Sequence, residues 1–276
     1  MHPIRSKVVS DVRLMEKYLT EDLGVPPNRI QLLLGSREHT FPGDPMNPSR
    51  ANVIDALLSI IDNPEILYGD NIVIFYSGHG SSYPFEREGD ALKYIEALCP
   101  IDRDTIGDDG KSVPDISDRE FNTILKQISR AKGQRITVIL DCCHSGSVSG
   151  GAGARMVCRT THTTLEDMLL AGEKILGGYP GYRSILSKDW YPDMDSYVVL
   201  EACKDYQLAK PKMVEGKDGG EGYIGIFTDS LVRALRSSNC TRETTYAGLV
   251  HFLDKTPHQT PVVDGKRRDA RLWYQE

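Results

Sequence analysis

The chain has 276 residues, of which 39% are hydrophobic and 26% charged, a composition that excludes a fibre or a disordered protein and allows a full hydrophobic core. A formal net charge of -6 and the lack of a basic stripe exclude nucleic acid as an expected partner. The N-terminus has no signal-peptide pattern and no stretch approaches the roughly 18 apolar residues of a membrane helix, so we expect a cytoplasmic protein with no membrane partner. Six scattered cysteines fit free thiols in a reducing compartment.

Amphipathic helical patterns alternate with apolar strand patterns along the chain. In chain order we expect a helix at 11–24, a strand at 29–35, a helix at 49–62, a strand at 71–80, a helix at 118–133, strands at 135–141 and 196–203, helices at 226–238 and 244–256, and an edge strand at 270–276. This alternation predicts an α/β fold in which helices cover both faces of a mostly parallel central sheet. We expect long irregular loops at 81–117 and 145–195, which in a compact domain are usually functional.

Two of the predicted strands end in residues that can carry out chemistry. The strand at 71–80 ends in "SGHG", which contains His79, and the strand at 135–141 runs into "DCCHSG", which contains Cys142 and Cys143. The carboxyl ends of parallel strands meet at one edge of a sheet. A thiol is a useful nucleophile only as thiolate, and a neighbouring imidazole commonly generates the thiolate at neutral pH. We therefore expect an imidazole and a thiol to meet at this edge.

Side-chain alternation along the strand separates the two adjacent cysteines. Cys142 shares its direction with the apolar residues of the strand and is expected in the core, whereas Asp141 and Cys143 share the opposite direction. If Asp141 faces a cleft, Cys143 faces it too. The glycines beside His79 leave backbone N–H groups approachable, so the amides of Gly80 and Cys143 are candidates for an oxyanion hole.

The cysteines could have roles other than that of a nucleophile. A phosphatase-type loop needs an arginine six positions after its cysteine, and Ser149 stands there after Cys143. A zinc site built from Cys142, Cys143 and His144 fails because neighbouring strand residues diverge and no second ligand pair is present. We interpret three of the cysteines as small core residues: Cys99, Cys142 and Cys203.

The two strand-end segments together resemble a known pair. "YSGHG" and "DCCHSG", with His79 and Cys143 separated by 64 residues, look like the catalytic motifs of the metacaspases, the caspase-like cysteine peptidases of clan CD, family C14. The segments "IEALCPIDR" and "VPDISDREF" resemble the fungal type I members. The resemblance implies a caspase-like fold for a single peptidase domain over 1–276, with a large-subunit-like part at 1–150, a linker loop at 151–195 and a small-subunit-like part at 196–276.

By this resemblance, His79 is the general acid and base and Cys143 the nucleophile of a thiol protease that hydrolyses peptide bonds through a thioester. The family cleaves after Arg or Lys, so its partners are protein or peptide substrates with those residues. Asp11 matches an acid that the family places in its first helix, Asp141 precedes the nucleophile by two, and Asp205 is a third candidate for the S1 pocket wall. Paired carboxylates would hold a guanidinium through charge-assisted hydrogen bonds.

The acids also have simpler readings. Asp11 follows Ser10, the expected cap of the first helix, and a first-turn acid favours the helix dipole without any substrate. Asp205 could be a solvated loop acid.

Calcium is the cofactor that the resemblance suggests, and no organic cofactor is expected. Asp102 and Asp118 match two of the family's ligand positions, but Arg119 and Gly150 stand where further acids belong. An EF-hand fails because Ile106 and Val113 occupy ligand positions of its loop. A solvated acidic loop is the alternative, and other acids that could substitute as ligands are Asp104, Asp108, Asp109 and Asp115.

Three expectations concern the chain as a whole. The family's strand before the first helix is apparently missing here, which motivates an alternative function as a catalytically weak or inactive caspase-fold scaffold. We expect a monomer. Self-processing is expected within the long linker, where the basic residues are Arg155, Arg159, Lys174, Arg183 and Lys188.

Overall fold

The computed structural model describes residues 3–35, 44–88, 91–107, 109–142, 163–203, 209, 211–215, 221–257 and 259–275. Within them, the central sheet has four strands in the order β1 (Ile72–Ser77), β5 (Ile136–Asp141), β6 (Val198–Glu201) and β9 (Val262–Asp264). The first three run parallel and β9 is antiparallel to β6. The predicted mostly parallel sheet is confirmed, and so are the strands expected at 71–80, 135–141 and 196–203.

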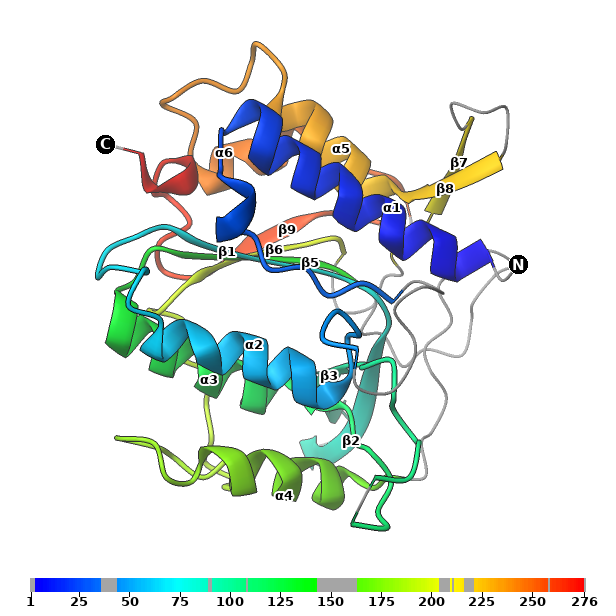
Figure 1. Ribbon diagram of the computed structural model, residues 1–276, viewed down its shortest axis with the longest axis vertical. Helices are drawn as coiled ribbons and strands as arrows, with labels where there is room; N and C mark the ends of the chain where they lie inside the picture. The colour runs from blue at the N-terminus through cyan, green and yellow to red at the C-terminus, as the bar shows by residue number, and fades with distance from the viewer. Residues whose placement is uncertain are drawn as a thin grey trace.

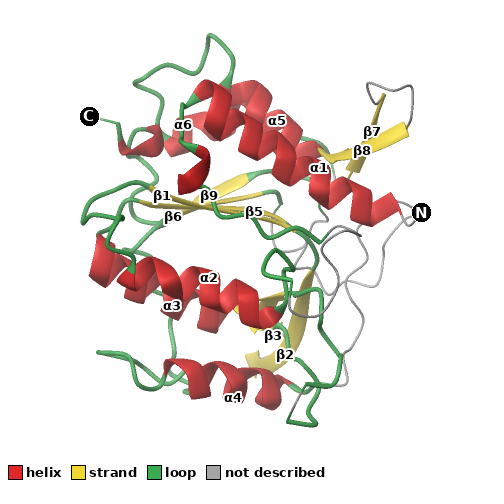
Figure 2. Ribbon diagram, in the orientation of Figure 1, coloured by secondary structure: helices red, strands yellow, loops and turns green. Residues whose placement is uncertain are grey.

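Helices cover both faces of this sheet (Figure 1). One face carries α1 (Pro3–Lys17), α5 (Ile226–Leu235) and α6 (Tyr246–Leu249), and the other carries α2 (Arg50–Asp62) and α3 (Asp118–Lys132). A further helix, α4 (Leu165–Leu176), lies outside α3 (Figure 2).

Local signals explain where α3 begins and ends. Ser117 is the N-cap, and its hydroxyl oxygen accepts a hydrogen bond from the backbone N–H of Glu120. Acidic side chains occupy the first turn and basic side chains the last, as the helix dipole favours. Gly133 ends the helix with a φ of 94°, a left-handed value that glycine adopts without strain.

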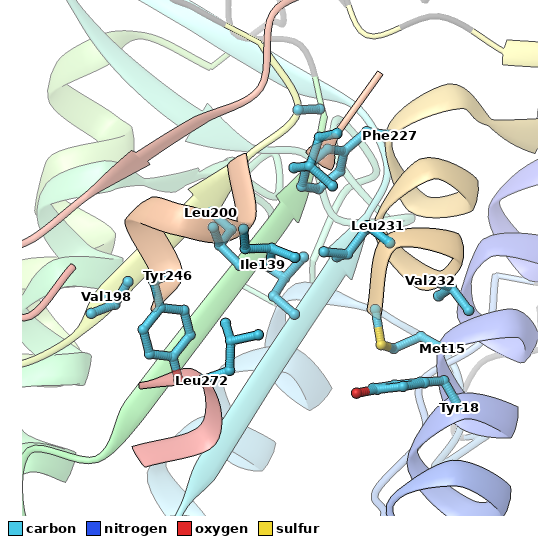
Figure 3. Close-up of a cluster of buried hydrophobic side chains, with 14 of the residues drawn as sticks. Met15, Tyr18, Ile139, Val198, Leu200, Phe227, Leu231, Val232, Tyr246 and Leu272 are labelled. Atoms are coloured by element: carbon cyan, nitrogen blue, oxygen red, sulfur yellow. The ribbon is translucent and has the colours of Figure 1, made fainter. Parts of the chain in front are cut away.

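The strand β5 divides the hydrophobic core in two. Ile139 packs with the side chains of α1, α5 and α6, including Met15, Phe227 and Tyr246 (Figure 3). Val138 faces the opposite way and packs with the side chains of α2 and α3. Every residue of β5 is buried, which is why its sequence reads as a continuous apolar run before Asp141.

Two predicted strands are wrong. The strand expected at 29–35 does not form: a 3₁₀ turn spans Pro27–Arg29, no described segment pairs with the residues after it, and the Leu34 N–H donates to the carbonyl of Met46 instead. An apolar run can form a strand only where a neighbour completes its hydrogen-bond ladder. The segment expected as an edge strand at 270–276 contains a 3₁₀ turn at Leu272–Tyr274, whose three side chains are buried in the core.

The first helix is longer than predicted. It begins at Pro3, continues to Lys17 and passes into a π-helical turn at Tyr18–Asp22. Ser10 therefore lies inside the helix and is not its cap. The simpler reading of Asp11, a first-turn acid beside that cap, is wrong for the same reason. The helix at 244–256 is shorter than predicted: α6 is followed only by a 3₁₀ turn at Val250–Phe252.

Both predicted loops contain regular structure. Residues 81–117 hold most of a three-stranded antiparallel sheet, β2 (Gly80–Glu88), β3 (Ala91–Leu98) and β4 (Ile116–Ser117). Residues 145–195 hold α4, whose start is fixed by a capping box between Thr164 and Asp167. A separate hairpin joins β7 (Pro211–Glu215) and β8 (Glu221–Gly225), and β8 contacts α1.

None of the helices formed by the described residues has both the length and the apolar character needed to cross a bilayer.

Candidate active site

The site predicted at the strand ends begins where β1 and β5 stop pairing. Ser77 and Asp141 are the last partners in their register. His79 follows Ser77 by two residues, and Cys143 follows Asp141 by two residues. The predicted nucleophile Cys143 lies outside the described residues, as does Asp205. His79 is described and lies between β1 and β2.

The backbone around His79 is held in place by its neighbours. Its carbonyl oxygen accepts hydrogen bonds from the N–H of Cys99, at 3.0 Å, and from the hydroxyl of Tyr76, at 2.7 Å. A Cβ atom on Gly78 would lie 2.4 Å from that same hydroxyl oxygen, so a larger residue there would displace the Tyr76 hydroxyl from the His79 carbonyl. Gly80, the predicted oxyanion-hole donor, is buried at the first position of β2.

The neighbouring cysteine behaves as alternation predicts. Cys142 is 2% exposed and packs in the same cluster as Val138 and Leu140, so its assignment to the core is confirmed. Cys203 is also buried, whereas Cys99 is only half-buried.

Asp11 and Asp141 meet in the interior although they come from different elements. Asp11, on α1, accepts hydrogen bonds from the N–H of Gly225 and the hydroxyl of Ser77, each at 2.6 Å. Asp141, at the end of β5, accepts at Oδ2 from the hydroxyl of Thr228 at 2.6 Å and from its N–H at 3.3 Å. Both aspartates have 0% of their surface exposed.

Gly225 shows how close the two carboxyl groups are. A Cβ atom built on Gly225 would lie 2.1 Å from Oδ2 of Asp141 and 3.0 Å from Oδ2 of Asp11, so both oxygens surround one point. A planar guanidinium can donate hydrogen bonds to two carboxylates at once. The structure thus places two acids together beside the strand edge that carries His79.

Sequence reasoning missed Ser77, Gly225 and Thr228. Ser77 had a signal, since it precedes His79 by two residues just as Asp141 precedes Cys143. Gly225 and Thr228 had none, because the hydrogen bond from Gly225 to Asp11 spans 214 residues of sequence.

The predicted calcium ligands do not form a set that fits this ion. The Asp102 Oδ1 atom accepts from the N–H of Arg50, at 2.8 Å, and Arg119 places its guanidinium against the carbonyls of Ile185 and Ser187. Across the described ranges, no group of three or more His, Cys, Asp or Glu side chains gathers as a metal site. Calcium prefers six to eight oxygen ligands, most of them carboxylates or carbonyls.

Asp118 is the other predicted calcium ligand, and the pKa of its carboxyl group is raised. Although the residue is exposed, protein surrounds its carboxyl group closely enough that desolvation raises its pKa to about 6. Hydrogen bonds from the N–H groups of Arg119 and Glu96 oppose this rise in pKa. The possible substitute Asp115 is bound by Arg103, and Asp108 lies outside the described residues.

The candidate processing positions differ in their local structure. Lys174 lies inside α4, so cleavage there would need local unfolding of a capped helix. Arg183 and Lys188 lie in exposed segments, and the Arg183 guanidinium stacks 4.0 Å from the ring centroid of Tyr191. Arg155 and Arg159 lie outside the described residues.

The chain is similar in sequence to proteins of one family. The family described as "Metacaspase, peptidase C14 domain" matches residues 6–150, slightly more than half of the chain. Metacaspase-4 of Arabidopsis thaliana is 31% identical over 141 residues, covering 51% of this chain and 29% of that protein. Metacaspase-1A of Aspergillus clavatus is 31% identical over 141 residues, covering 50% of this chain and 29% of that protein. Plant and fungal relatives are thus equally similar, and the fungal type I branch is not singled out.

The chain matches less than a third of the length of these relatives. Among solved structures, protein GSU0716 from Geobacter sulfurreducens aligns with a TM-score of 0.50 and 23% identity, covering 83% of this chain and 80% of that chain, and shares its fold. With the family match extending over more than half of its residues, the chain belongs to the metacaspase family of C14 peptidases.

Proposed function

We propose that this chain is a cysteine endopeptidase that hydrolyses peptide bonds after Arg or Lys. The observation that supports the proposal is the pair of buried carboxyl groups, Asp11 and Asp141, around one point beside Gly225. A substrate guanidinium or ammonium entering there would replace part of its lost hydration with charge-assisted hydrogen bonds. Asp205 is proposed as a third acid on the wall of the same pocket.

The chemistry follows from the residues at the strand ends. His79 takes the proton of the Cys143 thiol, and the thiolate attacks the carbonyl carbon of the scissile peptide bond. The N–H groups of Gly80 and Cys143 donate to the oxygen that becomes negative. His79 then gives its proton to the departing amine, which leaves a thioester. A water molecule activated by His79 hydrolyses the thioester and restores the thiol.

The test compares fluorogenic peptides that end in Arg, Lys or Asp. We expect cleavage of the Arg and Lys peptides only, and a loss of more than about a thousandfold in kcat/KM for Cys143→Ala. Cys142→Ala is the matched control, since this neighbouring thiol lies in the core. Asp141→Asn should lower kcat/KM for the Arg peptide by about a hundredfold, because it removes a charge and preserves the shape.

Two results would overturn the proposal. One is cleavage of the Arg peptide that survives Cys143→Ala, and the other is cleavage of the Asp peptide alone. If no peptide is cleaved and iodoacetamide labels Cys143 no faster than Cys142, the chain is better described as a caspase-fold scaffold. Mass mapping of the same samples reports whether Arg183, Lys188 or another basic residue is cut in the wild type and intact in Cys143→Ala.

A further inference from the structure

The strand that follows His79 is fastened along one face by a buried carboxylate. Ser81 and Tyr83 are two residues apart in β2 and therefore point to the same face. The hydroxyl of Ser81 donates to Oδ2 of Asp115 at 2.6 Å, and the hydroxyl of Tyr83 donates to the same oxygen at 2.8 Å. Asp115 is 0% exposed and immediately precedes β4.

Arg103 holds this carboxylate from the other side. Its Nε atom donates to Oδ1 of Asp115 at 2.7 Å and its Nη2 atom donates to Oδ2 at 2.6 Å. A bidentate pair of this kind fixes orientation as well as position. One buried carboxylate thus receives four hydrogen bonds, two from an arginine and two from β2. Arg50 adds a contact to the backbone, since its Nη1 atom donates to the carbonyl of Asp115 at 3.3 Å.

A second arginine, Arg119, contacts another side chain of β2. Phe85 lies where the pairing of β2 with β3 shifts register, and it packs against the same hydrophobic cluster as Tyr83. The guanidinium carbon of Arg119 lies 4.4 Å from the centroid of the Phe85 ring. The same guanidinium donates to the carbonyls of Ile185 and Ser187. The side chains of Ser81 and Tyr83 are therefore held by Asp115, and that of Phe85 by Arg119.

The attachment of β2 affects the position of His79, because β2 begins at the next residue, Gly80. Gly80 is the first residue of the strand and pairs with Leu98 of β3, and the next residue along, Ser81, is the first one bound to Asp115. The carbonyl of His79 is held by Cys99 and Tyr76. The direction in which the chain leaves His79 is thus set by the pairing of β2 with β3 and by the hydrogen bond from Ser81 to Asp115.

We propose that Asp115, oriented by Arg103, is a positioning residue for His79. It anchors the start of β2 so that the imidazole keeps its place beside the nucleophile. The proposal rests on the proposed function, because it assumes that His79 activates Cys143. A buried ion pair can also serve only the stability of the fold. The test therefore needs a measurement that a loss of stability alone would not change.

The measurement is the rate of alkylation of Cys143 by iodoacetamide between pH 5 and 9, followed by peptide mass mapping of the full chain. The titratable groups around Asp115 are Arg103, Tyr83 and the Arg50–Glu120 pair, and those beside His79 are Tyr76 and Cys99. Asp115→Asn should slow alkylation at pH 7 by about ten- to a hundredfold, because small misplacements of catalytic groups cost this much. The pH midpoint should move toward that of an ordinary thiol, near 8.5.

Two further variants test the proposal if Asp115→Asn folds poorly. Ser81→Ala with Tyr83→Phe removes the strand's bonds to Asp115 and leaves the ion pair with Arg103 intact. This double variant should also move the pH midpoint. Lys132→Met is the matched control, because it removes another buried cation, at the C-terminal end of α3, whose ammonium group donates to the carbonyls of Asn63 and Ile66.

We expect Lys132→Met to lower the melting temperature yet keep the wild-type alkylation rate within about twofold wherever it is folded. A wild-type rate and pH midpoint in both Asp115→Asn and the Ser81→Ala, Tyr83→Phe variant would overturn the positioning role while leaving the proposed function intact. Wild-type labelling of Cys143 that is no faster than that of Cys142 would instead overturn the proposed function and, with it, this inference.

Discussion

At the level of single residues, Gly225 is the position where backbone comes closest to both buried carboxyl groups. Its N–H donates to Asp11, and a side chain there would occupy the point that the oxygens of Asp11 and Asp141 surround. Glycine is therefore required by space, not by an unusual backbone angle, since its φ is -62°. Gly225 therefore belongs, with the two acids, to the pocket that we propose for the substrate side chain.

We expect Gly225→Ala to remove activity on Arg and Lys peptides. The added methyl group would lie 2.1 Å from Oδ2 of Asp141, so the carboxyl group must move or the backbone must shift. The loss should appear as a fall of at least about tenfold in kcat/KM with alkylation of Cys143 retained. Gly178→Ala is the control, because nothing lies within 4 Å of a Cβ atom at that residue. Unchanged kinetics in Gly225→Ala would place the substrate side chain elsewhere.

Residue types at the strand ends were readable from sequence, whereas their partners were not. His79 and Asp141 each follow an apolar run, and alternation separated Cys142 from Asp141 correctly. Ser77, Gly225 and Thr228 became visible only when α1, β1 and α5 were packed together. Short polar residues such as these carry no distinctive local pattern.

At the level of elements, the two buried acids on either side of β4, Asp115 and Glu120, already have arginine partners. Arg103 binds Asp115, Arg50 binds Glu120, and Arg119 lies between Phe85 and Trp190 with its guanidinium on two carbonyls. Buried carboxylates that are already paired with guanidinium groups offer few free lone pairs to a metal ion.

We therefore propose that millimolar Ca²⁺ neither stabilises nor activates this chain. The melting temperature and the Cys143 alkylation rate should be the same in Ca²⁺, in Mg²⁺ as the control divalent ion, and in a chelator. A saturable rise of the melting temperature with Ca²⁺ but not with Mg²⁺ would contradict this, because a ligand that binds only the folded state must stabilise it.

At the level of the whole molecule, an aromatic cluster closes the core on the face of the sheet that α1, α5 and α6 cover. Tyr18, Tyr246 and Trp273 pack against one another there, and the hydroxyl of Tyr246 lies within hydrogen-bond distance of the Thr137 hydroxyl. Burial raises the pKa of Tyr18 and of Tyr246 to about 12, from an ordinary value near 10. The folded state thus resists ionisation of these phenols.

This shift predicts a loss of stability in alkali. The folded pKa lies above the unfolded pKa, so the stabilisation is complete below about pH 10 and is lost as the pH rises toward about 12. Each fully buried tyrosine should contribute a loss of up to about 3 kcal/mol in the free energy of unfolding. Urea denaturation at pH 8, 10 and 11 measures it.

Tyr246→Phe isolates the contribution of one hydroxyl. The variant should be less stable than wild type at pH 8, because it loses hydrogen bonds with Thr137 and the N–H of Trp273, but its stability should fall less between pH 8 and 11. Tyr68→Phe is the control, since the Tyr68 side chain is 76% exposed. Parallel pH curves for wild type and Tyr246→Phe would contradict the assignment.

Features that are encoded within one element could be predicted from the sequence: the apolar runs of β1 and β5, the helices α2 and α3, and the motifs at His79 and Cys143 that resemble one family. Which of these features meet depends on how the whole chain packs. The tertiary structure left residues 31–35 without a strand partner, extended α1 past Ser10, and brought Asp11, Asp141 and Gly225 to one point. The reason is physical, because periodicity and capping act over a few residues, whereas strand pairing and side-chain packing depend on neighbours distant in sequence.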